Sequence, residues 1–368
     1  MSDSYSRTRG AGSAIGLVGL PVLNEDRNVY SLGFDASWEL GLFGKRDAAK
    51  KSGHAQLAAS EAAAQAVRAA LAGDVGHRYF SLCAMEKQIR TATAMLDSHK
   101  ESAALAKSRF EAGLVPELDV VQAEAEVAGA DAALAELANE RAKLRHALAV
   151  LLNRDTAWVE RALSETVDLP PPPTVAPAGI PADLLQRRPD ILQAGFELQA
   201  AIANERLARA DRYPQISLTG SFGRQSNEAG NLTLGASTFF AVGPAIRIPL
   251  FTGGAVKSNI ETTGSRERQA AIRYQSLANQ AIQEVEDSLA SVRSGETAVR
   301  VWEQAATGQR DALGLVTSLY QAGLTDFRAV LDAQRSLSDA EERVVSAERD
   351  LLLAHVALYR ALGGGWGG

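Results

Sequence analysis

Cysteine and long apolar runs are nearly absent from this sequence. Cys83 is the only cysteine among the 368 residues, so the chain cannot form an internal disulfide or a clustered thiolate metal site. No stretch reaches the roughly 18 consecutive apolar residues that a membrane-spanning helix needs. A passage built from strands is not excluded, because alternating strands give a much weaker hydropathy signal.

The sequence also has no large excess of positive or negative charge. The 38 Lys and Arg residues against 44 Asp and Glu residues leave a net charge of only -6. The sequence therefore lacks the basic patch that nucleic acid binding requires, and nucleic acid is not an expected partner. The first residues also lack the basic, apolar and small-residue series of a signal peptide. Either the protein stays in the cytosol or its true beginning precedes Met1.

Residues that could carry catalysis are scattered. The histidines stand apart from one another, at His54, His77, His99, His146 and His355. No two of them have metal-ligand spacing beside a carboxylate pattern, and no nucleophile is paired with a base. The sequence therefore predicts neither an enzyme nor a metal or cofactor site. The Gly-rich ending at 363–368 follows no strand and precedes no helix, which indicates a flexible tail and not a phosphate-binding loop.

Proline is absent from three long tracts rich in Ala, Leu, Glu, Gln and Arg. These tracts run from about residue 45 to 113, from 117 to 153 and from 254 to 362. Their composition predicts long helices. We expect them to form two helical hairpins, one at 45–153 and one at 254–362.

A heptad repeat marks the last of these helices. One seam position holds Val330, Leu337, Val344, Leu351 and Leu358, and the other holds Ala333, Ala340, Ala347, Ala354 and Ala361. This spacing of large and small residues predicts a closely packed coiled coil. The same register moved back by 210 residues meets apolar side chains everywhere except at Arg141. The chain is therefore predicted to be a tandem duplication.

The turns that end the two longest helices match as well. RFEAGL at 109–114 and LYQAGL at 319–324 share an aromatic residue, a glycine and a leucine. Gly113 and Gly323 are expected to end their helices in the left-handed conformation that glycine adopts without strain. The need for a turn explains the two glycines. It does not explain why both tips also share an aromatic residue and a leucine, and this shared pattern indicates a further role.

Residues upstream of each hairpin alternate with a period of two. From Tyr30 to Leu42 the even positions are apolar and the odd ones mostly polar, which is typical of a strand with two unlike faces. Strands are predicted at about 4–9, 28–43, 213–224 and 238–251. Strands of a soluble sheet alternate equally well, so alternation alone leaves a soluble sheet and a membrane barrel about equally favoured. Aromatic residues near the strand ends and the duplication favour the barrel.

A Pro-rich segment at 169–181 joins the two halves. Successive prolines exclude a helix, so we expect an extended linker. The first repeat then covers 1–168 and the second 182–362. The second repeat opens with a helix at 182–212 that has no counterpart in the first. By the repeat offset, roughly 30 residues of helix and an export signal are expected before Met1.

Six runs spread over nearly the whole chain carry a family resemblance. They are FDASWELGLFGK at 34–45, RFEAGLVPELDVVQAE at 109–124, IPADLLQRRPDI at 180–191, IPLFTGG at 248–254, YQAGLTDFRAVLDAQRSL at 320–337 and ALGGGW at 361–366. Together and in this order they resemble the TolC-like outer-membrane efflux proteins, especially the NodT and OprM type lipoprotein branch of RND efflux systems. The lipid-bearing cysteine with which that branch normally begins has no match in this sequence.

The resemblance implies a fold that is mainly α with a transmembrane β-barrel portion. In that family each of three protomers gives four strands to one twelve-stranded barrel and long helices to a periplasmic tunnel. The implied function is a passive export duct for small molecules such as drugs, in the outer membrane of a Gram-negative bacterium. The implied partners are two further copies of the chain, outer-membrane lipid, a periplasmic membrane-fusion adaptor and an inner-membrane RND pump.

The resemblance also assigns roles to single residues. Asp332 matches the pore-constriction aspartate, and a position one turn earlier that is acidic in some members is Ala329 here. Asp119 and Tyr320 match positions that lock neighbouring helices in the closed state, although Asp119 could equally complement the start of the helix near Glu117. The hairpin tips are implied to dock the adaptor through Gly113, Leu114, Val115, Gly323 and Leu324.

Two other interpretations remain open from the sequence. A soluble coiled-coil scaffold accounts for the heptads but not for the alternating strands. A truncated fragment of an efflux protein that does not assemble accounts for both. The sequence does not indicate which compounds are exported, since a wide water-filled duct need not recognise them.

Overall fold

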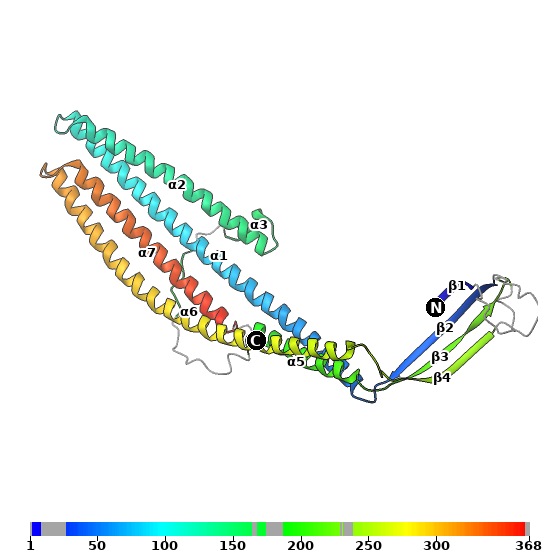
Figure 1. The fold of residues 1–368 in the computed structure, drawn as a ribbon. Coiled ribbons are helices and arrows are strands. Elements are labelled where there is room, and N and C mark those ends of the chain that lie inside the picture. Colours follow the sequence, from blue (N-terminus) through cyan, green and yellow to red (C-terminus); the bar gives the residue numbers. More distant parts are fainter. Residues whose placement is uncertain are drawn as a thin grey trace, which may run out of the picture. The chain divides into compact units, whose positions relative to one another are not determined.

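A computed structural model describes residues 2–8, 27–163, 168–173, 187–228, 230 and 238–364 of the chain. The elements follow one another in the order β1, β2, α1, α2, α3, α5, β3, β4, α6 and α7 (Figure 1). The chain divides into two compact units, one formed by residues 1–58 and 196–272 and the other by residues 59–195 and 273–368. The fold is mostly helical with a small antiparallel sheet, as predicted.

The sheet of the first unit has four antiparallel strands in the order β1-β2-β3-β4. They are β1 (Ser2–Thr8), β2 (Arg27–Leu40), β3 (Gln215–Ser226) and β4 (Thr238–Arg247). The last strand ends earlier than expected, next to Pro249, which has no N–H to donate to a ladder. Arg9, the end of the first predicted strand, lies outside the described residues.

The sheet has one apolar and one polar face. Phe222 of β3 lies opposite both Phe34 of β2 and Phe240 of β4, and 61%, 60% and 80% of Phe34, Phe222 and Phe240 are exposed. Successive side chains of a strand point to opposite faces. The residues of β2 and β3 that point to the other face are mostly polar. They pair Asp35 with Ser221, Ser37 with Thr219 and Glu39 with Ser217. A contiguous exposed apolar face of this kind marks an interaction surface.

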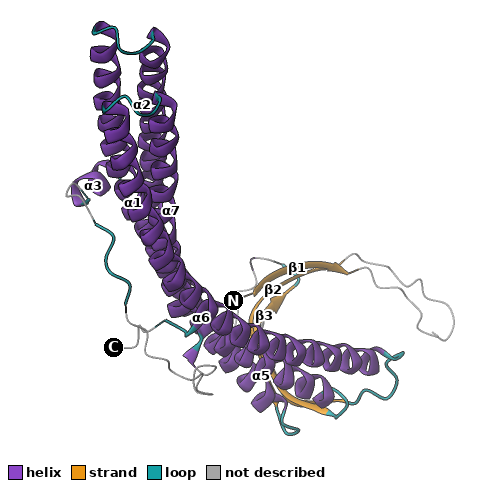
Figure 2. Cartoon of the chain, turned by 90° about the vertical axis from the view of Figure 1, so that its left-hand side faces the viewer, coloured by secondary structure: helices purple, strands orange, loops and turns teal. Residues whose placement is uncertain are grey.

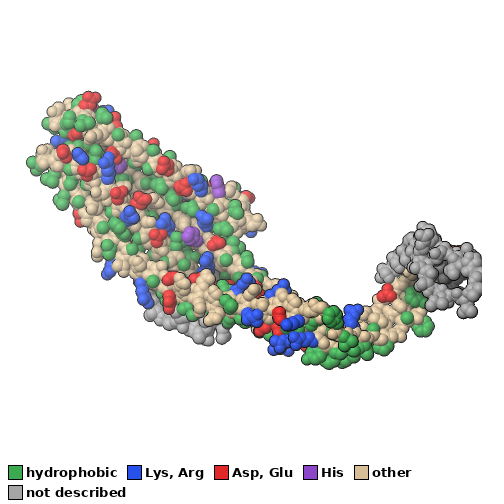
Figure 3. All heavy atoms as spheres, viewed as in Figure 1, with side chains coloured by type: hydrophobic (Ala, Val, Ile, Leu, Met, Phe, Trp, Pro, Cys, Tyr) green, Lys and Arg blue, Asp and Glu red, His purple; other side chains and the backbone are tan. Residues whose placement is uncertain are grey.

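Further apolar side chains gather where the strands join the helices of the same unit (Figure 3). Leu250 and Phe251 follow β4 and are 91% and 93% exposed. Phe43, which follows β2, stacks on Tyr213 with 5.0 Å between ring centroids. Aromatic residues therefore cluster where the strands meet the helices of this unit.

Four long helices pair as two hairpins of equal dimensions. Helices α1 (Lys45–Glu111) and α6 (Ala255–Gln321) have 67 residues each, and α2 (Glu117–Leu151) and α7 (Phe327–Ala361) have 35 residues each. Figure 2 shows the helices of the hairpins side by side. Each helix of the second hairpin begins 210 residues after its counterpart, which is the offset of the heptad register.

Helix α7 buries a broader face than the heptad predicts. Four of the five large seam residues are buried, whereas Val344 is partly exposed and Val345 lies in the core instead. The polar residues Gln334 and His355 are buried as well. The reason is that α7 is covered on two sides, by α6 of its own hairpin and by α1 of the other. The buried face of α7 is therefore wider than the two heptad positions.

The chain has two shorter helices, α3 in the second unit and α5 with residues in both units. Helix α3 (Thr156–Ala162), which the sequence did not predict, is capped by Asp155, whose carboxylate accepts from Trp158 N at 2.6 Å. Helix α5 (Pro189–Ala210) falls within the helix expected at 182–212, whose first residues are not described. Residues 169–173 of the expected linker form neither helix nor strand, and its remainder at 174–181 lies outside the described residues. Within the described ranges, no helix has an apolar stretch that could cross a bilayer.

Candidate functional site at the hairpin tips

Both hairpins turn through the same backbone motif. Gly113 and Gly323 have positive φ angles of 71° and 74°, as predicted for left-handed helix ends. Leu114 N donates to Arg109 O at 2.8 Å and Leu324 N to Leu319 O at 2.9 Å. Each glycine N–H also bonds back to the carbonyl three residues earlier. This is the Schellman arrangement, which satisfies the free carbonyls at a helix end.

The tips expose four of the five residues expected to dock a partner. Leu114 and Leu324 are 65% and 75% exposed, and both glycines are exposed beside them. Val115 differs, because it is partly buried and packs against a cluster that contains Phe327 and Val330. Val115 therefore supports the tip from inside, whereas the two leucines and two glycines form its surface.

A hydrogen bond joins the two hairpins just behind the tips. Tyr320 Oη, at the end of α6, donates to Asp119 Oδ2, in the first turn of α2, at 3.3 Å. The Tyr320 ring is only 2% exposed and packs on Phe327 with 5.3 Å between centroids. The structure thus brings together the two residues that the family resemblance paired.

Burial and the nearby Asp119 carboxylate raise the pKa of Tyr320, Arg109 lowers it, and the net result is a pKa of about 12. The hydroxyl therefore keeps its proton throughout the physiological range. A protonated phenol donates and a carboxylate oxygen accepts, so Tyr320 is the donor in this bond.

Arg109 is a third member of this contact, and the sequence reasoning missed it. Its Nη1 donates to the Gln321 carbonyl at 2.7 Å, and its guanidinium lies 4.9 Å from the centroid of the Tyr320 ring. A cation at the carbonyl end of α6 also complements the helix dipole. The signal was the basic residue that RFEAGL carries where LYQAGL has Leu319. We call Arg109, Asp119 and Tyr320, with the Gln321 carbonyl, the tip latch.

Asp332 lies apart from the tip latch, on the exposed side of α7. Its carboxylate is 3.9 Å from Arg328 Nε, and the two side chains are 61% and 83% exposed. Such an exposed pair adds little stability. Within one chain Asp332 is therefore a solvated helix residue, as it would be without the resemblance.

A buried polar cluster joins α1 to α7 farther from the tips. Gln334 is 1% exposed and His99 7%, and His99 Nδ1 lies 3.1 Å from Gln334 Oε1. Gln334 Nε2 donates to Ser102 Oγ at 2.9 Å, so Oε1 must accept from a protonated Nδ1. Burial lowers the pKa of His99. The heptad pattern gave no signal for this cluster, because Gln334 lies outside the predicted seam.

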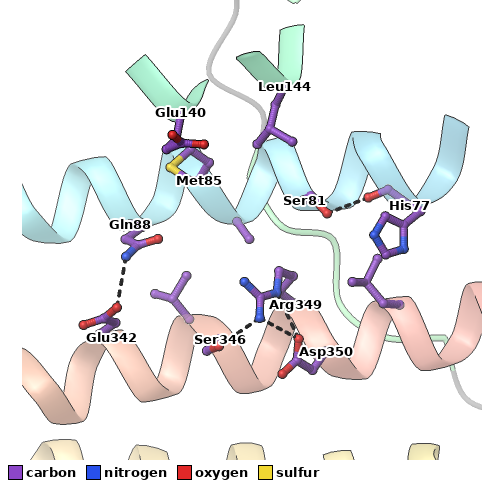
Figure 4. A pocket seen from close by; sticks show the side chains of 13 residues that line it. His77, Ser81, Met85, Gln88, Glu140, Leu144, Glu342, Ser346, Arg349 and Asp350 are labelled. Atoms are coloured by element: carbon purple, nitrogen blue, oxygen red, sulfur yellow. Dashed lines mark hydrogen bonds and ion pairs between the residues drawn. The ribbon is translucent and has the colours of Figure 1, made fainter. Parts of the chain in front are cut away.

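A polar crevice of about 430 Å³ lies between α1, α2 and α7 (Figure 4). Gln88 Nε2 of α1 donates to Glu342 of α7 at 3.4 Å, and Arg349 Nη2 donates to Asp350 at 2.8 Å. The crevice is therefore part of the contact between the hairpins. Among the residues that the structure describes, no group of three or more His, Cys, Asp or Glu could hold a metal.

Solved structures that resemble this chain are outer-membrane channels. The outer-membrane channel OprN is 30% identical, with a TM-score of 0.87 over 99% of this chain and 81% of OprN. The outer membrane protein VceC of Vibrio cholerae is 25% identical, with a TM-score of 0.83 over 99% of this chain and 86% of VceC. The fold and its paired tips therefore define an outer-membrane channel protein.

Relatives in sequence show which family of outer-membrane channel proteins the chain resembles. The solvent efflux pump outer membrane protein SrpC of Pseudomonas putida is 32% identical over 92% of this chain and 71% of its own length. The outer membrane protein OprJ of Pseudomonas aeruginosa is 34% identical over 89% and 68%. The outer membrane efflux protein family matches residues 2–154 and 180–364. The chain belongs to this family, and its relatives are efflux proteins of the outer membrane of Gram-negative bacteria.

Proposed function

We propose that three copies of the chain form one duct that carries small molecules such as drugs across the periplasm and the outer membrane. The observation that carries this proposal is the exposed row of Phe34, Phe222 and Phe240 on one face of the sheet. Contact of such an apolar face with lipid has no free-energy cost, whereas its exposure to water does. The polar face behind it then lines the water-filled interior.

The sheet edges support closure by further copies. Within the described residues, β1 and β4 each have a hydrogen-bonded neighbour on one side only. Backbone groups in lipid need an internal partner, so a sheet in the membrane has to close on itself. Pairing β4 of one copy with β1 of the next leaves no edge, and three copies give a barrel of about twelve strands.

The equal hairpins support a chain made of two repeats. In this proposal the first repeat covers 1–168, the Pro-rich linker 169–181 and the second repeat 182–362, with a flexible tail at 363–368. The matching lengths of α1 and α6 and of α2 and α7 favour it. Three copies then supply six similar hairpins to one helical tunnel.

Asp332 is the proposed constriction of this tunnel. Its carboxylate is exposed in the single chain, and in a threefold assembly it becomes a ring of three negative charges. Such a ring narrows the duct and favours cations. Because Ala329 stands one helical turn earlier, the constriction has one acidic ring instead of two.

The hairpin tips are the proposed docking surface for a periplasmic membrane-fusion adaptor. Leu114 and Leu324 are exposed apolar side chains, and Gly113 and Gly323 beside them let a partner's backbone approach closely. The tip latch holds the helix ends together in the closed state. The adaptor, which also contacts an inner-membrane RND pump, draws the ends apart, and substrate then passes without any energy source in the duct itself.

Outer-membrane localisation and conductance test this function together. The protein expressed from its complete gene should separate with outer-membrane vesicles as a trimer and form ion-conducting pores in planar lipid bilayers. A Phe240→Asp variant places a charge on the lipid face and should lose membrane insertion. A matched Ser37→Asp variant on the polar face should retain it. Recovery of wild-type protein as a soluble scaffold, or as monomers without conductance, would refute the proposal.

A further inference from the structure

An apolar pocket of about 280 Å³ lies in the second unit, where the last turns of α7 pack on α1. Its lining is mostly apolar, with Ala69, Ala72 and Phe80 on α1 and Leu352 and Val356 on α7. Every residue that lines it belongs to the second unit. The pocket is therefore complete within one chain and needs no second copy.

Hydrogen bonds hold the end of α7 at the rim of this pocket. Gly364 N donates to the Tyr359 carbonyl at 3.0 Å, and Arg188 Nη1 donates to the Ala361 carbonyl at 3.2 Å. Arg188 is only 8% exposed and forms two ion pairs as well. The pocket is thus formed before a ligand enters, and a ligand loses little free energy in ordering its walls.

His355 brings a polar group to this apolar lining. It is 3% exposed, and neither Nδ1 nor Nε2 has a hydrogen-bond partner in the part of the chain that the structure describes. Buried nitrogens without a partner cost free energy, so native proteins nearly always supply one. The unpartnered ring therefore indicates that a bound molecule completes the pocket.

Water alone is a poor occupant, because an internal water needs roughly two to four polar partners. Among the described residues that line the pocket, His355 is the single buried polar side chain, and Tyr359 and Arg360 are exposed. The stem of Arg360 lies along α1, since a side-chain carbon added at Gly73 would be 3.3 Å from Arg360 Cδ. A mostly apolar ligand with one polar group therefore fits better.

The polar group that fits a neutral His355 is a hydroxyl. Burial lowers the pKa of His355, and Glu296 opposes this effect only in part, so the ring is neutral at physiological pH. A neutral imidazole has one N–H donor and one acceptor nitrogen, and a hydroxyl group both accepts and donates. A carboxylate accepts only, and its charge would be buried among apolar side chains.

The size and lining of the pocket favour an aromatic ring as the apolar part of the ligand. Phe80 and Tyr359 line the pocket, and aromatic rings pack favourably on one another. The small side chains of Ala69 and Ala72 leave room for a flat ring against α1. A cavity of roughly 150 Å³ in an unrelated protein holds benzene, so about 280 Å³ accommodates a ring with a substituent.

We propose that this pocket binds a neutral monocyclic aromatic molecule that carries a hydroxyl group, with the hydroxyl on His355 and the ring against Phe80. Phenol is the simplest member of this class. The pocket joins α1 of the first hairpin to α7 of the second, so an occupied pocket stabilises the contact between the hairpins. The inference concerns a single chain and does not depend on the proposed export function.

Titration with fluorinated probes, followed by fluorine NMR of the purified full-length protein, tests the role of His355. The probes para-fluorophenol and para-fluorotoluene have nearly the same shape, and only the phenol can bond to His355. His355→Leu removes the bond and keeps an apolar side chain, so the variant should fold. The affinity for the phenol relative to the toluene should fall about fivefold in this variant. An unchanged ratio would contradict the role of His355 and, with it, the inference.

Variants of the α1 wall test where the phenol binds. Ala72→Phe fills the pocket and should abolish binding of both probes, whereas Ala70→Phe, on the exposed side of the same helix, should not. Trp366→Ala should leave both affinities unchanged, and a gain would mean that this indole, two residues after Gly364, is the occupant instead. In crystals soaked with para-iodophenol, anomalous scattering from iodine should place the ring beside Phe80. No binding by the wild-type protein, or iodine found only elsewhere, would overturn the inference.

Discussion

Tyr320 and Asp119 are 201 residues apart in the sequence, yet the tyrosine hydroxyl donates to the aspartate at 3.3 Å. The bond crosses from the second hairpin to the first. The Tyr320 ring is buried beside Phe327, so the ring holds its place by packing and the hydroxyl contributes the polar contact. The two contributions can therefore be separated by mutation.

Tyr320→Phe should loosen the closed tips without unfolding them. The ring still fills its site, and only the bond to Asp119 is lost, which is worth about 1 kcal/mol or roughly a fivefold change in an opening equilibrium. Single-channel recordings should show more frequent or larger openings, with the melting temperature nearly unchanged. Asp119→Asn keeps an acceptor oxygen and should show a smaller effect. If the conductance of Tyr320→Phe equals that of the wild type, the tip latch does not control opening of the duct.

Arg109→Leu should open the tips as well, since it removes both the bond to the Gln321 carbonyl and the stacking on Tyr320. Leucine is the residue that the second repeat carries at this position, as Leu319, so the substitution suits the local helix. Arg109→Lys keeps the charge but not the planar fork, and it should lie between wild type and Arg109→Leu in conductance. Equal conductance of Arg109→Lys and Arg109→Leu would show that geometry, and not charge, holds the contact.

Gly113→Asp and Gly323→Asp should abolish export while trimers persist. Both glycines have positive φ, and Asn and Asp are the non-glycine residues that tolerate this region best. Gly113→Asn and Gly323→Asn therefore carry nearly the same backbone strain without the charge. If docking is the cause, drug susceptibility of the host should rise with Asp and much less with Asn. Normal export by the Asp variants would contradict the docking assignment.

Asp332→Asn should change ion selectivity and divalent block. The substitution removes three carboxylates from the proposed ring and keeps side-chain volume, so cation preference and sensitivity to Mg²⁺ should both fall. Bilayer recordings in asymmetric salt measure the reversal potential directly. Asp339→Asn, an exposed carboxylate on the same helix, is a matched control that should leave the reversal potential unchanged.

Acid should destabilise the contact between the hairpins. Burial lowers the pKa of His99 below its value in the unfolded chain, an effect that nearby Glu126 opposes and Arg335 reinforces. The neutral ring therefore contributes stability above about pH 6.5, and this contribution is lost as pH falls through that value, because the unfolded state takes up the proton first. The pKa of His355 is lowered by burial in the same sense.

His99→Asn tests this dependence, because an Asn amide can donate to Gln334 but does not titrate. The melting temperature of the wild-type protein should fall between about pH 7 and pH 5, and the fall should be smaller in the variant. The remainder belongs to His355, and a His99→Asn and His355→Asn double variant should reduce it further. An unchanged pH dependence in the double variant would assign the acid response to other groups.

The sequence predicted the parts of this fold that depend on local pattern. Helices follow from composition and heptads, and the period of two from Tyr30 to Leu42 placed the faces of β2. The left-handed geometry at Gly113 and Gly323 followed from residue type, because glycine alone adopts it freely. Each of these depends on neighbours within a few residues.

What depends on contacts between distant segments was not predicted from pattern. The buried face of α7 is wide because α1 of the other hairpin also packs on it, and the heptad of α7 alone does not indicate this second contact. Arg109 acts on a carbonyl 212 residues away, and Gln334 bonds to serines more than 200 residues away. The pairing of Asp119 with Tyr320 was available only because a family resemblance supplied it.

The equal lengths of α1 and α6, 67 residues each, carry a consequence for how such a chain can change. At 1.5 Å of rise per residue each helix spans about 100 Å, and one inserted residue rotates everything beyond it by about 100°. A lengthened α1 would carry its tip past the tip of α6 and turn its seam away. Longer or shorter helices are therefore tolerated only when whole heptads are added to or removed from both hairpins together, so that the two tips stay level.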